Sequence, residues 1–143
     1  MNISDDLIAF TNSKPDLNAR AVMQLSVLDW AACGLVGAAE GSFENFVAAN
    51  ATNGPCQVLC GGTASPTNAA LIIGTLSHAL NFDESHFAHM GHPSVAVVSA
   101  ALATAQHLNA TTLDMIDAAL IGAEASVSVG LWLGLDYYQV GYD

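Results

Sequence analysis

Apolar residues recur along this chain at intervals of three and four, the spacing that places residues on one face of an α-helix. The segment after Asp16 shows this best, with apolar positions at Ala21, Val22, Leu25, Leu28, Ala32 and Leu35. We expect this stripe to face the core. No alternating pattern typical of a strand exceeds a few residues, so the sequence predicts an all-α helical bundle.

Capping residues predict where the first helices begin and end. Ser4 can cap a short first helix and Asp16 a second one, because a side-chain oxygen accepts hydrogen bonds from the free N–H groups of the first turn. We expect the second helix to end at Gly37 and Gly41. We predict a third helix over residues 42–50.

The second half of the chain carries clearer start signals. Ser65 is followed by Pro66, and proline costs nothing at the first helical position, where its missing N–H would have no partner. Pro93 opens another helix by the same logic. Thr111, with Asp114 three residues later, resembles a capping box and begins the last helix.

Composition limits what the chain can be on its own. It has 143 residues, of which 52% are hydrophobic and 10% charged, whereas soluble domains usually have about 25% charged residues. The length suits one helical domain, which we predict over residues 1–143. Because so few polar residues are available to cover the apolar mass, we expect the chain to belong to a larger assembly or a longer protein.

The charge balance argues against two kinds of partner. Thirteen acidic residues stand against Lys14 and Arg20, and the formal net charge is -11. Binding to nucleic acid needs cations that neutralise phosphates, and attachment to an anionic membrane surface needs basic side chains as well. We therefore expect neither nucleic acid nor a membrane among the partners.

Two further features bear on the compartment. The first ten residues lack the basic region of a secretory signal, so we expect a cytoplasmic protein whose three cysteines are reduced. Residues 118–135 are apolar enough to resemble a membrane span, but acidic residues bracket them and no basic residue is near. We instead predict a buried bundle helix, in which small residues admit a neighbouring helix. These small residues are Gly122, Ser126, Gly130 and Gly134.

The reactive polar groups concentrate in one window. Four of the five histidines lie within residues 78–92, together with Asp83 and Glu84. Histidine exchanges protons near neutral pH, and an acid beside it can orient the ring or raise its pKa. The window connects two predicted helices, and loops of this length inside compact domains are more often functional than idle.

His92 has the most informative position in this window. It precedes Pro93, whose helix presents the N–H groups of Ser94 and Val95 and the positive end of its dipole to the loop. Such an end binds anions, so a bound carboxylate would lie beside the imidazole. The plain alternative is that His92 only caps its helix, with the two acids in solvent.

A metal-binding loop is another interpretation of the same residues. His86, His89 and His92, together with Asp83, offer three or four ligands to zinc or iron. Short histidine clusters are also common without a metal. We expect neither a metal nor a cofactor here.

Several segments, in order, resemble the N-terminal part of the MmgE/PrpD family, which includes 2-methylcitrate dehydratase, cis-aconitate decarboxylase and iminodisuccinate epimerase. The most specific segment is the run His-Ala-Leu-Asn-Phe-Asp-Glu-Ser-His, followed by His-Pro-Ser. The resembling stretches are residues 25–38, 65–70, 74–86, 92–94 and 120–138.

The resemblance implies a cofactor-independent lyase or isomerase, usually a homodimer, with a large helical domain and a smaller α/β lid domain. Such enzymes move a proton next to a carboxylate of a small polycarboxylate, then eliminate water, lose CO2 or invert a centre. A histidine beside an anion-binding helix N-terminus suits that proton transfer.

The resemblance also implies roles for residues in the window. His92 matches the family's catalytic histidine, Asp83 matches an acid of its aspartate run, and Ser85 matches a hydroxyl residue that binds substrate. Asn81 stands where the family commonly has Asp. The expected site comprises His92, Asn81 and Asp83 as catalytic residues and Ser85, His86 and Ser94 as substrate-binding residues.

The chain departs from the family in its length and at its end. It is far shorter than the usual members, it has no Lys or Arg after Arg20, and Asp143 stands where a second active-site histidine is expected. We therefore expect a fragment without the lid domain that is inactive alone. A different interpretation is a non-catalytic helical module that packs against a partner.

Overall fold

A computed structural model describes residues 3–12, 14–59, 61–88, 90–134 and 136. These residues form six helices and one two-stranded antiparallel sheet, which confirms the all-α prediction. In chain order the elements are α1 (Ile3–Thr11), α2 (Leu17–Glu40), α3 (Glu44–Asn50), β1 (Cys56–Gln57), β2 (Thr63–Ala64), α4 (Pro66–His78), α5 (Pro93–Leu108) and α6 (Thr112–Leu133).

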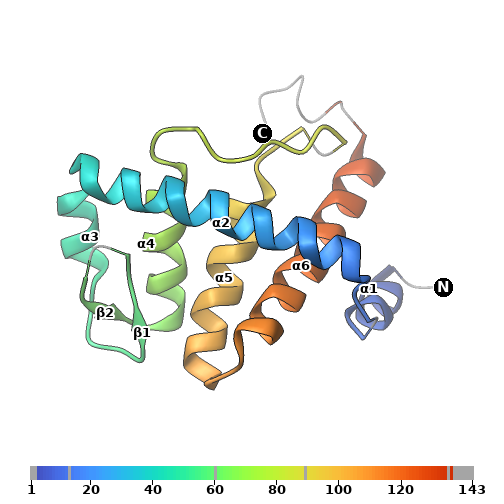
Figure 1. The fold of residues 1–143 in the computed structure, drawn as a ribbon, viewed down its shortest axis with the longest axis horizontal. Helices are drawn as coiled ribbons and strands as arrows, with labels where there is room; N and C mark the ends of the chain where they lie inside the picture. Colours follow the sequence, from blue (N-terminus) through green and yellow to red (C-terminus); the bar gives the residue numbers. More distant parts are fainter. Residues whose placement is uncertain (1–2, 13, 60, 89, 135, 137–143) are drawn as a thin grey trace.

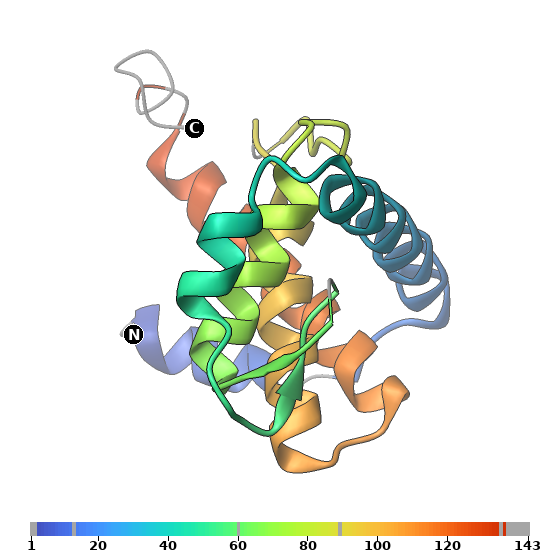
Figure 2. The same ribbon diagram turned by 90° about the vertical axis from the view of Figure 1, so that its left-hand side faces the viewer.

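The helices form two layers. α4, α5 and α6 lie side by side, and the long helix α2 crosses all three on one side of them (Figure 1). In the turned view α2 stands apart on one side of the α4–α5 pair (Figure 2). The core lies between these layers and includes Trp30, Ile72, Ile73, Val98 and Ala119.

The predicted caps of the longer helices are confirmed. Asp16 accepts hydrogen bonds from the backbone N–H groups of the first turn of α2, and Ser65 does the same for α4. Thr111 and Asp114 form a reciprocal capping box at the start of α6. The expected cap at Ser4 is wrong, because α1 begins at Ile3 and includes that residue.

The two glycines of α2 differ in role. Gly41 ends the helix with a φ of 79°, in the left-handed region that glycine adopts readily. Gly37 does not end the helix but lies inside it. A Cβ atom at Gly37 would lie 2.1 Å from the carbonyl oxygen of Leu76, so this glycine lets α4 approach α2 closely.

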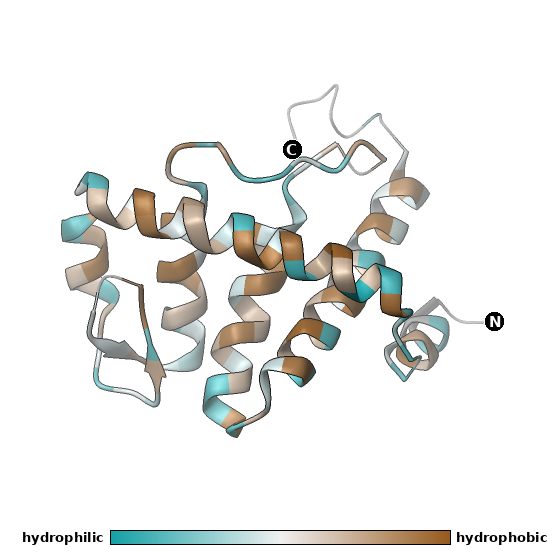
Figure 3. Ribbon diagram, viewed as in Figure 1, coloured by the Kyte–Doolittle hydropathy of each residue, from teal (hydrophilic) through white to brown (hydrophobic). Residues whose placement is uncertain are grey.

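The apolar stripe of α2 faces outward, contrary to our expectation. The exposed fractions are 63% for Val22, 67% for Leu25 and for Leu28, and 57% for Leu35. The helix buries another face, which carries Met23, Trp30, Gly34 and Gly37. Figure 3 shows hydrophobic positions recurring along α2, the helix that crosses in front of α4, α5 and α6 in this view. Periodicity predicted the helix correctly but assigned the wrong side to the core.

The last long helix is also less buried than predicted. α6 buries Met115, Ile116, Ala119, Leu120 and Gly130, whereas Leu131, Trp132 and Leu133 are exposed. α2 and α6 are both long and apolar enough to cross a membrane, and 22% of each apolar window is buried. Length and composition alone do not establish a span, because core helices and signal sequences have the same properties.

The small sheet packs against α5. The backbone N–H of Gln57 donates to Oε1 of Gln106 over 2.6 Å. Cys56 is buried, and burial raises the pKa of its thiol. Cys33 and Cys56 are free thiols, and Cys60 lies outside the described residues.

Candidate functional site

The histidine-rich window forms the loop between α4 and α5. It leaves the C-terminal end of α4 and enters the N-terminal end of α5 at the same edge of the bundle, so the two helices run antiparallel (Figure 1). Asn81 and Met90 both have a φ of 54°. The N–H of His86 donates to the carbonyl of Gly91 over 2.9 Å and closes the far part of the loop.

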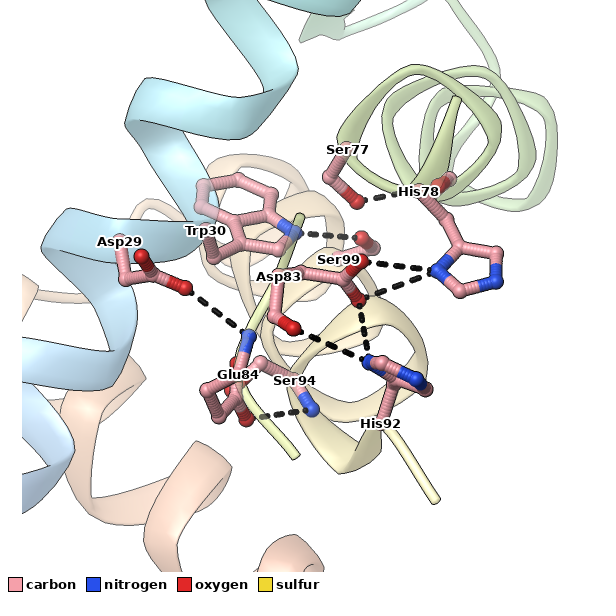
Figure 4. A network of polar contacts seen from close by, with 10 residues as sticks. Asp29, Trp30, Ser77, His78, Asp83, Glu84, His92, Ser94 and Ser99 are labelled. Atoms are coloured by element: carbon pink, nitrogen blue, oxygen red, sulfur yellow. Dashed lines mark hydrogen bonds and ion pairs between the residues drawn. The ribbon is translucent and has the colours of Figure 1, made fainter. Parts of the chain in front are cut away.

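Asp83 is the centre of this loop. Its side chain is 0% exposed and lies between two imidazoles (Figure 4). Nδ1 of His78 lies 2.9 Å from Oδ1 and 3.1 Å from Oδ2, and Nδ1 of His92 lies 3.5 Å from Oδ2. The alternative in which the acids stay in solvent is therefore wrong for Asp83.

His92 is oriented by the backbone as well as by the carboxylate. Its Nδ1 lies 3.1 Å from the carbonyl oxygen of Asp83. Because a carbonyl only accepts, Nδ1 carries the hydrogen, and Nε2 of the neutral ring keeps the lone pair. His92 occupies the N-cap position of α5 but makes no side-chain capping hydrogen bond. The interpretation that it only caps its helix does not explain this geometry.

The rings of His78 and His92 lie close together. Their centroids are 5.0 Å apart at an interplanar angle of 61°. The side chains are 44% and 28% exposed, respectively. Two partly accessible imidazoles thus share one buried carboxylate.

The N-terminal end of α5 already holds an anion, the side chain of Glu84. Its Oε1 accepts a hydrogen bond from the N–H of Ser94 over 3.1 Å and a second one from the Ser94 hydroxyl. The predicted anion-binding end is therefore filled by the protein's own carboxylate. Both donors of Ser94, expected to bind substrate, are engaged with Glu84.

Burial raises the pKa of Glu84 above its ordinary value. The nearby charges of Asp83 and Asp29 add to the rise, whereas the hydrogen bonds from Ser94 oppose it. Oε2 of Glu84 is buried and has no hydrogen-bond partner among the described residues. The buried oxygen without a partner and the two acidic neighbours both raise the free energy of the charged form of Glu84.

Asp29 and His78 belong to the site, although the sequence analysis assigned them no role. Oδ2 of Asp29, on α2, accepts the backbone N–H of Glu84 over 3.0 Å and anchors the loop. One signal was present in the sequence: Asp29 is the single charged residue between Arg20 and Glu40. For His78, the signal was its position five residues before Asp83.

Three of the predicted site residues do not join this cluster. The side chains of Asn81, Ser85 and His86 are exposed, and they make no hydrogen bond to His92 or Asp83 in the described part of the chain. Among the described residues, His78 rather than His86 lies beside Asp83, and His86 is exposed. His89 and Asp143 lie outside the described residues.

Comparison with known proteins gives one match. A family model described as the MmgE/PrpD N-terminal domain matches residues 8–142. No curated protein and no solved structure gave a match. The matched range includes the whole loop between α4 and α5 and confirms the resemblance inferred from its residues.

Proposed function

Because the chain belongs to the family defined by the MmgE/PrpD N-terminal domain, we propose that it forms the histidine-bearing helical part of a lyase or epimerase site for small polycarboxylates. The observation that carries the proposal is the orientation of His92. Its Nδ1 is held 3.1 Å from the carbonyl oxygen of Asp83, so Nε2 is available as a base. The proposed reaction needs no cofactor.

Each protein group has a defined task in this proposal. Nε2 of His92 takes a proton from the carbon next to a substrate carboxylate, as a general base. The imidazolium that forms lies near the buried carboxylate of Asp83, whose negative charge stabilises it. The same nitrogen then returns the proton to a leaving hydroxyl group or to the carbanion.

Substrate contacts are proposed for the exposed side of the loop. Ser85 and His86 present a hydroxyl and an imidazole to solvent, and Asn81 adds an amide that can hydrogen-bond a carboxylate but cannot act as a base. Ser94 can bind substrate only if Glu84 moves away from its two donors. We therefore propose that Ser94 positions Glu84 and that the loop residues bind the substrate.

We also propose that the protein is a homo-oligomer. The outward stripe of α2, formed by Val22, Leu25, Leu28 and Leu35, is more than half exposed. Large contiguous apolar surfaces on soluble proteins mark interaction sites. This stripe equally supports the second candidate function, a non-catalytic module that acts by packing against a partner.

Hydrogen exchange tests the catalytic proposal. The protein, and the longest product that its gene encodes, would be incubated in D2O with 2-methylcitrate, cis-aconitate or iminodisuccinate and followed by 1H NMR. We expect loss of the signal next to a carboxylate, abolished in His92→Gln and retained in His107→Gln, which alters an exposed histidine in the last turn of α5.

The possible outcomes separate the two candidate functions. Exchange that persists in His92→Gln would remove the assignment of the base. No exchange with any of the three substrates would favour the assembly module. Circular dichroism of both variants would verify that the helices are intact.

A further inference from the structure

We propose that His78, Asp83 and His92 form a binding site for a divalent transition-metal ion of the zinc class. We further infer that metal binding and proton transfer by His92 exclude each other, and this second part rests on the function proposed above. This set of ligands differs from the one that the histidine spacing predicted, since it includes His78, which that prediction left out.

The distances in the cluster suit a metal ion. One potential ligand atom from each of the three residues lies within 4.8 Å of the other two. Zinc bonds of about 2.0–2.2 Å at tetrahedral angles place ligand atoms roughly 3.3 Å apart. The separations from Asp83 to His78, 2.9 and 3.1 Å, and to His92, 3.5 Å, bracket that value.

The electrostatics of the cluster favour a cation. The carboxylate of Asp83 is fully buried, and a buried charge requires a partner or a metal. Within the described residues no Lys or Arg forms an ion pair with it, because Arg20 is paired with Asp117. The chain has one other Lys or Arg residue, Lys14, which lines a hollow formed by residues of α1, α2 and α6.

Neighbouring groups add negative potential. The N–H of Glu84 is bonded to the carboxylate of Asp29, so two further acids lie beside Asp83. Burial raises the pKa of the Cys33 thiol, and the charges of Asp29, Asp83 and Glu84 raise it further. A cation would reduce the repulsion that these groups share.

The site is also accessible and coordinatively open. The two imidazoles are 44% and 28% exposed, so an ion can enter from solvent. Two nitrogens and one oxygen suit zinc, iron or nickel. Three protein ligands leave a fourth position for water or a carboxylate.

Metal binding would change the state of His92. Nδ1 carries the hydrogen that faces the carbonyl of Asp83. For Nδ1 to bind a metal, that hydrogen must leave, and the neutral ring then carries its hydrogen on Nε2. Nε2 would lose the lone pair that proton abstraction needs. Metal binding would therefore block the base.

Calorimetric titration of the chelator-treated protein with zinc chloride tests the site. We expect one zinc ion per chain and at least about tenfold weaker binding in His78→Gln, Asp83→Asn and His92→Gln. His86→Gln and His107→Gln, which alter exposed histidines, should bind as the wild type does. Because His78 is nearly half exposed, its variant should fold even if Asp83→Asn does not.

Each outcome decides a part of the proposal. Absence of zinc binding by the wild type, unchanged affinity in His78→Gln, or an equal loss in the two control variants would overturn the site. In the D2O assay, zinc should suppress exchange and EDTA should restore it; exchange unaffected by bound zinc would overturn the exclusion. Exchange that depends on His92 but occurs without any zinc binding would leave the proposed function intact.

Discussion

The carboxylate of Glu84 lies against the backbone of Ser94, with Oε1 of the acid 3.1 Å from the amide nitrogen. The hydroxyl of Ser94 donates to the same oxygen, and Asp29 accepts the N–H of Glu84. One residue of the loop thus joins α2 to the first turn of α5. Because Glu84 follows Asp83 directly, this contact also holds the acid between the two histidines.

The contact between Glu84 and Ser94 should stabilise the fold. Hydrogen bonds to a charged group contribute about 1.5–3 kcal/mol. In a double-mutant cycle of Glu84→Ala and Ser94→Ala, we expect a coupling of about 1–3 kcal/mol in the free energy of unfolding, measured in urea. Additive effects of the two substitutions would show that the contact contributes nothing to stability.

Glu84 should make stability depend on pH. Its pKa is raised in the folded chain, mainly by burial, so the folded state binds this proton more tightly than the unfolded state does. The resulting stability is fully present below the ordinary value of 4.5 and is lost as pH rises through the higher folded pKa. In Glu84→Gln this dependence should disappear from urea unfolding curves recorded across that range.

Asp117 provides a control of opposite sign. Its hydrogen bonds with Arg20 lower the pKa of its carboxyl below the ordinary value. Its contribution is therefore present above that value and is lost as pH falls through the folded pKa. Asp117→Asn should lower the free energy of unfolding at neutral pH, and this variant should then lose less stability than the wild type in acid. The same pH response in both variants would refute the assignment to Glu84.

Gly37 should tolerate no side chain. A Cβ atom there would lie 2.1 Å from the carbonyl oxygen of Leu76, so Gly37→Ala must push α4 away from α2. We expect a loss of about 1–3 kcal/mol in the free energy of unfolding. At Gly122 the nearest atoms are those of Val97 at 3.4 Å, so Gly122→Ala should be neutral or gain up to about 1 kcal/mol. Equal thermal unfolding midpoints for the two variants would contradict this difference.

Local signals were enough to predict the helices. The caps at Asp16, Ser65 and Thr111 depend on residues two or three positions away. Both partners of each capping hydrogen bond therefore lie close together in the sequence. The side of α2 that faces the core depends on distant helices. Trp30 and Gly37 are buried because α5 and α4 meet them there, through Ser99 and Leu76. Apolar spacing alone does not contain that information.

The sequence identifies the histidine-rich window as the candidate site, but it does not predict the contacts within that window. The histidine-rich window and the position of His92 before α5 are both readable from the chain. The pairing of Asp83 with two histidines depends on the path of the loop, including the left-handed backbone at Asn81. Glu84 fills the end of α5 for the same reason. The roles of Asn81, Ser85 and His86 remain predictions.

The outward stripe of α2 should make the protein self-associate. Leu25 and Leu28 are each 67% exposed, and burial of apolar surface contributes about 25 cal/mol per Å². We expect a dimer or larger species by light scattering after size-exclusion chromatography, and a shift toward monomer in the double variant Leu25→Gln with Leu28→Gln. Leu71→Gln, which alters a half-exposed leucine of α4, should leave the mass unchanged. A wild-type monomer at high concentration, or an equal effect of Leu71→Gln, would refute assembly through this stripe.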